Sequence, residues 1–296
     1  MAVRTSLTFP AKTSYKKLDF FLRSKGISRR LITALKYVDC LKINGQPATT
    51  ITPVFAGDVV TLVFPREEAL SCEAQAGELH VLYEDDDILA VCKPHGIATH
   101  PALGTASGTL GNFVSYYYQS QGCPLPFRPV SRLDKETEGL LIIAKHKLAH
   151  HSLSQQQKNG SFQKKYLALV EGVPAEEKGE IDLPIAREAQ ASLRRVVRCD
   201  GKPAHTLYRV LCSGKHHSLL EVELKTGRTH QIRVHLSHIG HPIVGDPLYG
   251  TPGKRLYLHS YAAKFLHPIT KEQMELTAPC NFETILSKIE NEEPIS

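Results

Sequence analysis

Residues 129–144 read PVSRLDKETEGLLIIA, a polar loop that runs straight into an apolar segment. The apolar part, residues 140–144, predicts a buried strand. A carboxylate in the loop before it, Asp134, can face a cleft while the sheet behind holds its backbone in place. Arg132 could neutralise this carboxylate or bind a phosphate. An aspartate in such a loop is more often a turn former or a surface ion-pair partner, so the rest of the chain must decide.

Two further segments carry groups that suit chemistry beside such a carboxylate. Residues 93–101, KPHGIATHP, form a loop rich in turn residues after a predicted buried strand. Residues 164–172, KKYLALVEG, open a strand with two lysines, of which Lys165 is a candidate substrate ligand, and with Tyr166. The ring of Tyr166 could stack on a nucleobase, or it could pack as an ordinary core aromatic.

Arginine and histidine crowd one segment near the end of the chain, residues 224–250 (LKTGRTHQIRVHLSHIGHPIVGDPLYG). Thr229 is a candidate N-cap for a short helix there. Arg228, His230 and Arg233 are donors that would suit an anionic substrate, because guanidinium forks match carboxylate and phosphate oxygens. The histidines also raise a metal-site hypothesis. The segment has no H-E-x-x-H and no acidic residue before Asp246, so we predict no metal site.

The early part of the chain, residues 16–64, predicts a small unit of two helices followed by strands. Gly26 would end the first helix and Ser28 would cap the second, which is expected over residues 29–37. The Asn44-Gly45 pair predicts a hairpin turn. The unit holds eight Lys or Arg against three Asp, a local basic excess that favours a polyanion partner.

Two helices followed by KINGQ and GDVV at residues 42–46 and 57–60 resemble the S4-type RNA-binding domain. The resemblance implies that the start of the second helix meets RNA phosphates, which a helix N-terminus also favours. The residues that it assigns to RNA binding are Arg29, Arg30 and Lys36.

Composition sets broad limits on the whole chain of 296 residues. The net charge is +6 and the apolar fraction is 42%, which predicts a folded, mildly basic protein. No run of about eighteen apolar residues predicts a membrane span, and the start lacks the pattern of a secretory signal. Seven scattered cysteines without a C-x-x-C pair indicate reduced thiols. We therefore expect a cytoplasmic location.

Three motifs in this order, RLDKETEGLLIIAK (132–145), KKYLALVEG (164–172) and TGRTHQIRVHLSHIGHPIVGDPLYG (226–250), are similar to the RluA/RluD family of RNA pseudouridine synthases. The likeness spans residues 16–280. It implies an α+β fold: a catalytic domain with a mixed, largely antiparallel sheet and flanking helices, behind the small S4-like α/β domain. It also implies isomerisation of uridine to pseudouridine in structured RNA, with large-subunit ribosomal RNA expected first and transfer RNA second. An isomerisation needs no cofactor, and we expect no obligate protein partner.

The same resemblance assigns roles to individual residues. Asp134 falls on the catalytic aspartate, as nucleophile or as base, Tyr166 on the active-site tyrosine, and Arg233 on the arginine that pairs with the aspartate. Arg132 matches the arginine that helps to displace the target base. Ser131 replaces the usual histidine, and Glu138 replaces a common serine and is expected to face solvent.

The predicted organisation is an N-terminal extension (1–15), the S4-like domain (16–64), a linker (65–79), the catalytic domain (80–285) and a frayed acidic tail (286–296). Two rival hypotheses stay open at this point. The protein could be a non-catalytic RNA-binding or ribosome-assembly factor, or a metal-dependent hydrolase built on the histidines.

Overall fold

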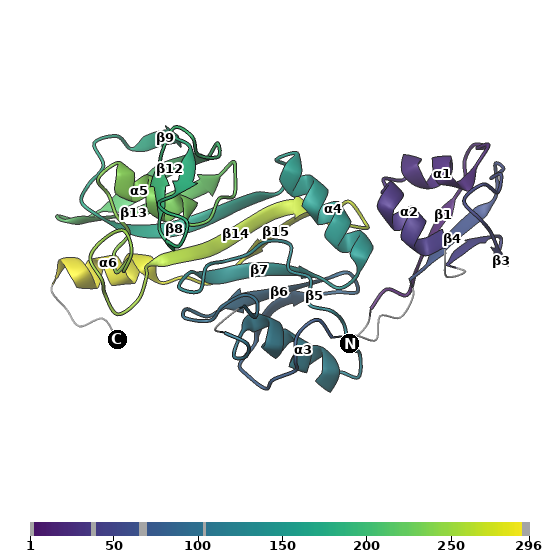
Figure 1. Ribbon diagram of the computed structural model, residues 1–296, viewed down its shortest axis with the longest axis horizontal. Helices are drawn as coiled ribbons and strands as arrows, with labels where there is room; N and C mark the ends of the chain where they lie inside the picture. Colours follow the sequence, from purple (N-terminus) through teal and green to yellow (C-terminus); the bar gives the residue numbers. More distant parts are fainter. Residues whose placement is uncertain (1–2, 37–39, 65–69, 103–104, 292–296) are drawn as a thin grey trace.

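The computed structural model describes residues 3–36, 40–64, 70–102 and 105–291, and for Arg30, residues 34–36 and residue 289 it describes the backbone alone. The fold is α+β, with a small N-terminal module beside a larger body (Figure 1). No helix within these ranges is both long and apolar enough to cross a membrane.

The N-terminal module is a four-stranded sheet in the order β1-β4-β2-β3 with two helices. Its elements are β1 (Ser6–Pro10), α1 (Leu18–Ser24), α2 (Arg29–Lys36), β2 (Leu41–Ile43), β3 (Gln46–Pro47) and β4 (Val59–Val63). The local predictions are confirmed: Gly26 follows α1 with φ 77°, and the Ser28 hydroxyl accepts the N–H of Leu31 at the start of α2. Asn44 and Gly45 both have positive φ at the hairpin turn.

Strand β1 lies in the segment that the sequence analysis assigned to an N-terminal extension. It pairs antiparallel with β4 along its whole length, from Ser6 opposite Val63 to Pro10 opposite Val59. Its residues alternate between exposed and partly buried, as a strand with one covered face requires. The strand shields the edge of β4, which is otherwise open to pairing with another chain.

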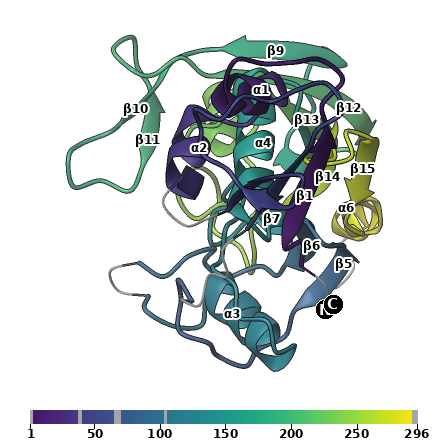
Figure 2. The ribbon, with the colours of Figure 1, turned by 90° about the vertical axis from the view of Figure 1, so that its right-hand side faces the viewer.

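The body is built on a nine-stranded sheet in the order β5-β6-β7-β14-β8-β13-β12-β9, with β15 paired to β14. All neighbours are antiparallel except β7 and β14. The strands are β5 (His80–Glu84), β6 (Ile88–Lys93), β7 (Glu138–Ala144), β8 (Gln163–Glu171), β9 (Lys178–Asp182), β12 (His205–Ser213), β13 (His217–Leu224), β14 (Leu258–Leu266) and β15 (Gln273–Thr277). A separate hairpin, β10 (Ile185–Arg187) with β11 (Arg195–Val197), stands beside this sheet (Figure 2).

The two halves of the large sheet meet at a short parallel contact between β7 and β14. Only His259 opposite Glu138 and Ser260 opposite Gly139 are in register there. Gly139 has φ 107°, and a Cβ on it would lie 2.3 Å from the carbonyl oxygen of Ser260. Only glycine permits both this backbone angle and this approach. The loop that carries Asp134 enters β7 at this contact.

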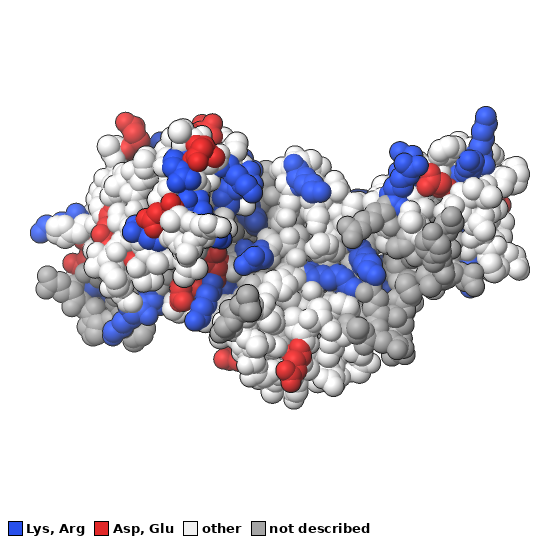
Figure 3. Space-filling view, viewed as in Figure 1, with Lys and Arg blue, Asp and Glu red and all other residues white. Residues whose placement is uncertain are grey.

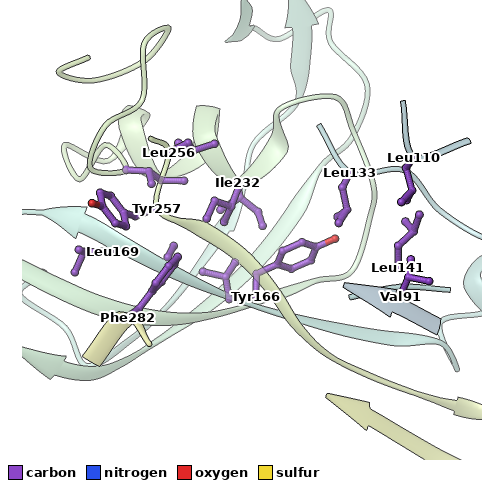
Figure 4. Close-up of a cluster of buried hydrophobic side chains, with 14 of the residues drawn as sticks. Val91, Leu110, Leu133, Leu141, Tyr166, Leu169, Ile232, Leu256, Tyr257 and Phe282 are labelled. Carbon is purple, nitrogen blue, oxygen red and sulfur yellow. The ribbon is translucent and has the colours of Figure 1, made fainter. Parts of the chain in front are cut away.

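Four helices flank the sheet: α3 (Leu110–Ser120), α4 (Lys147–Lys158), α5 (Gln231–His238) and α6 (Phe282–Glu290). The apolar core runs between them and the sheet and includes Leu133, Tyr166, Ile232 and Phe282 (Figure 4). The expectation of a frayed tail after residue 285 is wrong for residues 286–290, which belong to α6. Leu286 is buried, and the Glu290 carboxylate accepts the backbone N–H of Lys215 and His216.

The chain enters and leaves the N-terminal module at one place on the body. Before β1, the Arg4 guanidinium donates two hydrogen bonds to the buried carboxylate of Asp87, at 2.6 and 2.9 Å. After β4, the Phe64 ring stacks on the imidazole of His146, 4.8 Å between centroids. His146 Nε2 lies 2.8 Å from the same Asp87 carboxylate. Both ends of the module are thus tied to one cluster.

Candidate functional site

A cavity of about 380 Å³ lies over the contact between the two halves of the sheet, the size class of a small-molecule site. The Asp134 loop, the start of β8 and the segment that leads into α5 supply its walls. Its lining residues include Arg132, Asp134, Lys164, Tyr166, Arg228, His230 and Arg233. Among the described residues that line it, Asp134 is the one carboxylate.

The Asp134 loop is braced from below by the KPHGIATHP segment. The buried ammonium of Lys93 donates to the carbonyls of Pro94, Ile97 and Lys135, at 2.7 to 3.0 Å. Burial lowers the pKa of Lys93 to about 8, although neighbouring carboxylates oppose that shift. The Thr99 hydroxyl donates to the carbonyl of Leu133 at 2.7 Å. The backbone on both sides of Asp134 is therefore fixed before any substrate arrives.

The side chains of Arg233, in α5, and His230, at its N-cap, face the Asp134 carboxylate. Nη1 of Arg233 lies 3.9 Å from Asp134 Oδ2, and Nε2 of His230 lies 3.8 Å from the same oxygen. Arg233 is only 3% exposed, whereas the Asp134 side chain is 33% exposed. The carboxylate can thus meet a substrate from the cavity while its counter-charge stays buried.

The closest partner of Arg233 is a different carboxylate, that of the fully buried Asp246. Nε and Nη2 of Arg233 donate to its two oxygens at 2.7 and 2.6 Å. Burial lowers the pKa of Arg233, but Asp246 more than offsets this and raises the pKa overall. The bidentate bond fixes the guanidinium plane and leaves Nη1 directed toward Asp134.

The position of Tyr166 is compatible with both alternatives from the sequence, a core aromatic and a ring that a nucleobase can stack on. It is 4% exposed and belongs to the core, where Figure 4 shows its ring between Ile232 and Leu133. It also lines the cavity next to Asp134. Burial, with Asp134 nearby, raises the pKa of its hydroxyl, so the phenol stays protonated.

The other predicted ligands divide into those in the cavity and those outside it. Arg132, Arg228 and His230 line the cavity. Lys165 lies on the opposite face of β8, where its ammonium pairs with Glu221 at 3.2 Å, because side chains alternate along a strand. Its neighbour Lys164 takes the place in the cavity, and burial lowers the pKa of Lys164 to about 8.

The structure corrects two expectations, one about the exposure of Glu138 and one about the N-cap of α5. Glu138 is partly buried instead of facing solvent, and it pairs with Arg255 and His259. Burial alone would raise the pKa of Glu138, but His259 and Arg255 lower it. The N-cap of α5 is His230, with φ 59°, instead of Thr229. Ser131, the second departure, lines the cavity.

Of the histidines proposed for a metal site, His230, His235 and His241 are engaged by other groups. His235 is buried between the hydroxyl of Thr206 and the carbonyl of Leu183. In the described part of the chain, the group whose ligand atoms lie close enough for a metal is Asp85, Asp87 and His267. Arg4 and His146 already occupy that group from the N-terminal junction.

Comparison with known proteins agrees with this geometry. Residues 87–238 match the family model described as RNA pseudouridylate synthase. A Bacillus subtilis protein named uncharacterized RNA pseudouridine synthase YjbO is 38% identical over 86% of this chain and 92% of its own length. Ribosomal large subunit pseudouridine synthase D of Zymomonas mobilis is 36% identical over 85% of this chain and 86% of its own.

The chain belongs to the RNA pseudouridylate synthase family. The solved structure of human RNA Pseudouridylate Synthase Domain Containing 1 has a TM-score of 0.59 to it, with 29% identity over 71% of this chain and 86% of that one. The predicted enzyme class is confirmed: the synthase isomerises uridine in RNA to pseudouridine. Membership of this family favours that activity over the rival hypotheses of a non-catalytic RNA-binding factor and a metal-dependent hydrolase.

A second hollow of the synthase adjoins the cavity and shares Gly227, Arg228 and Thr229 with it. The β10–β11 hairpin supplies Arg187 and Arg195 to the other wall of that hollow, and Lys202, which bridges to Ile185, also lines it. In Figure 3, Lys and Arg side chains gather along the left-hand lobe where it borders the central hollow. Arg29 of the N-terminal module is exposed, while the side chains of Arg30 and Lys36 lie outside the described residues.

Several residues of the site were not predicted from the sequence. Asp246 and Tyr249 lie in the GDPLYG turn, whose pattern predicts no role for either side chain, and Lys93 reads as an ordinary loop lysine. Lys164 is the neighbour of Lys165, the predicted substrate ligand. The alternation of a strand, applied from Tyr166, places Lys164 on the same face, so this signal was present.

Proposed function

We propose that this synthase converts uridines of large-subunit ribosomal RNA to pseudouridine and that Asp134 is its catalytic carboxylate. The observation that carries the assignment is that Asp134 is the one carboxylate among the described residues lining the cavity, with Arg233 and His230 beside it. The identity with a protein named ribosomal large subunit pseudouridine synthase D supports the choice of RNA.

The chemistry breaks the C1′–N1 bond of uridine and joins C1′ to C5, while a proton leaves C5 and N1 gains one. Asp134 acts on the ribose, either as nucleophile at C1′ or as base at C2′. Arg233 faces the carboxylate with its positive charge and orients it. Because the reaction is an isomerisation, its atoms and electrons balance without an external oxidant or reductant.

The target nucleotide must leave its helix before the reaction, which costs a few kcal/mol and least at loops and bulges. Arg132 is exposed at the mouth of the cavity and would take the place of the extruded base. The buried ring of Tyr166 would form the surface on which the uracil stacks. Arg228 and Lys164 would bind the flanking phosphates.

We further propose that residues 16–64 of the N-terminal module form an S4-like RNA-binding domain, in front of a catalytic domain over residues 80–285. Two helices followed by β2, β3 and β4, with an exposed Arg29 at the start of α2, support this proposal. The N–H groups at a helix start favour phosphate.

The test of the catalytic assignment is Asp134→Asn, measured by tritium release from RNA labelled at C5 of uridine. We expect loss of product with RNA binding retained, since the change removes the charge and keeps the shape. Asp182→Asn, at an exposed aspartate on β9, is the matched control and should retain full activity. Clear turnover by Asp134→Asn would refute the role of Asp134.

The two routes and the choice of RNA need separate measurements. Deuterium at C2′ of the target uridine should slow the reaction only if Asp134 removes that proton. Pseudouridine mapping in cells with and without the gene should show sites lost from large-subunit ribosomal RNA. A loss confined to transfer RNA would contradict the proposed substrate.

A further inference from the structure

Tyr249 joins the catalytic carboxylate to the β10–β11 hairpin. Its hydroxyl lies 2.8 Å from Nδ1 of His230 and accepts the backbone N–H of Arg195, also at 2.8 Å. Arg195 opens β11, and Nε2 of His230 lies 3.8 Å from Asp134 Oδ2. A continuous path of polar contacts therefore runs from the hairpin to Asp134.

The hydrogen count along this path favours one position for the proton of His230. The Tyr249 oxygen accepts from Arg195, so its own hydrogen needs an acceptor. Among the described residues, Nδ1 of His230 is the acceptor within hydrogen-bond distance. A neutral imidazole that accepts at Nδ1 carries its proton on Nε2, the atom that faces Asp134.

The surroundings hold both rings in this arrangement. The guanidinium groups of Arg233 and Arg194 lie 5.1 and 5.6 Å from the centre of the Tyr249 ring, within the range of cation–π attraction. His230 adopts the left-handed conformation, with φ 59°, which is costly for a residue with a Cβ and is kept where the surroundings enforce it. Burial lowers the pKa of His230; Asp134 opposes this shift, while Arg233 and Arg195 add to it.

We propose that Tyr249 is a positioning residue that fixes the Nε2–H tautomer of His230, so that His230 and Arg233 together hold Oδ2 of Asp134. This inference rests on the proposed catalytic role of Asp134. Both contacts fall on one oxygen, which leaves Oδ1 for the ribose. The second part of the proposal is that the hairpin maintains the tautomer through the N–H of Arg195, so that RNA seated on the hairpin also sets the catalytic carboxylate.

The decisive readout is the tautomer itself, which does not depend on activity. In protein labelled with ¹⁵N-histidine, two-bond proton–nitrogen correlations distinguish the tautomers, and the His230 signal is assigned by its loss in His230→Gln. We expect neutral His230 with its proton on Nε2 in the wild type. Tyr249→Phe should lose this preference. A proton on Nδ1 in the wild type, or an unchanged tautomer in Tyr249→Phe, would overturn the proposal.

Steady-state kinetics distinguish a positioning role of Tyr249 from a role in substrate binding. Tyr249→Phe should lower kcat about tenfold, the effect of one lost hydrogen bond, with KM for RNA unchanged. Tyr117→Phe is the control, since it removes a hydroxyl of α3 that donates to Glu84 of β5 and should leave both constants as they are. A rise in KM alone would make Tyr249 a substrate-binding residue and would contradict the proposal.

Two substitutions at one position test the link to the hairpin. Arg195→Ala removes the guanidinium and keeps the N–H, whereas Arg195→Pro removes both. Only the proline variant should change the His230 tautomer and kcat, although both should bind RNA less tightly. The same tautomer in both variants would disprove the link, and thermal unfolding checks that each variant is folded. The two proposals can fail separately. If Asp134→Asn is inactive but Tyr249→Phe leaves the His230 tautomer unchanged, the catalytic role of Asp134 stands and the positioning role of Tyr249 is refuted.

Discussion

At the scale of single residues, the site depends on a cation shared between two carboxylates. Arg233 is bound bidentately by the buried Asp246 and only approached by Asp134, at 3.9 Å. Asp246 also accepts the backbone N–H of Leu248 and Tyr249. One buried side chain thus fixes both the counter-charge of Asp134 and the turn that carries Tyr249.

Asp246→Asn should destabilise the protein by about 3–5 kcal/mol, because it leaves a buried guanidinium without its partner. Urea unfolding followed by circular dichroism measures the change. Asp182→Asn, at an exposed carboxylate, should stay within about 0.5 kcal/mol of the wild type. Equal stability of the two variants would show that the Arg233–Asp246 pair contributes little to folding.

At the scale of elements, the parallel contact of β7 with β14 sets where the site lies. It brings the Asp134 loop, the start of β8 and the α5 segment to one place, although they are far apart along the chain. The contact is short, so it depends on the close backbone approach at Gly139.

Gly139→Ala should cost about 3 kcal/mol of stability, since the methyl group would meet the Ser260 carbonyl and the positive φ adds strain. Gly122→Ala is the control: its φ is 69°, but a methyl there would meet no described atom within 4 Å. It should cost about 1 kcal/mol. Thermal unfolding of both variants compares them, and a similar loss in each would mean that the clash is relieved by a small shift of β14.

At the scale of the whole molecule, the N-terminal module is held against the body by contacts at both of its ends. Arg4 binds Asp87, and Phe64 stacks on His146. Leu148 of α4 packs into the core of the module. This attachment gives the module a defined position relative to the cavity, so one RNA can contact both if the module binds RNA as proposed.

Arg29→Ala and Arg30→Ala should weaken RNA binding and reduce the slope of log K against log salt by about 1 each, as lost phosphate contacts do. The chemical step should keep its rate at saturating RNA, because the groups that line the cavity stay unchanged. Filter binding over a range of salt concentrations gives the slope. Lys12→Ala, an exposed lysine of the same module outside α2, should leave it unchanged. Unaltered slopes in the arginine variants would count against an RNA-binding module.

The sequence by itself determined the class of fold, the helices and strands with strong periodicity, and the family to which the chain belongs. Turns and caps such as Asn44-Gly45 and Ser28 could be predicted because their physics is local. The motif around Asp134 indicated the catalytic carboxylate by resemblance, and the structure places that residue in the cavity.

Only the tertiary structure decided which groups surround that carboxylate. Arg233 takes Asp246 as its close partner, Lys164 replaces Lys165 in the cavity, and Tyr249 reaches the β10–β11 hairpin. Each of these contacts depends on which face of a strand points inward or on a turn folded back over the sheet. Pairing energies between distant residues are set by burial and geometry, which the order of residues along the chain does not state.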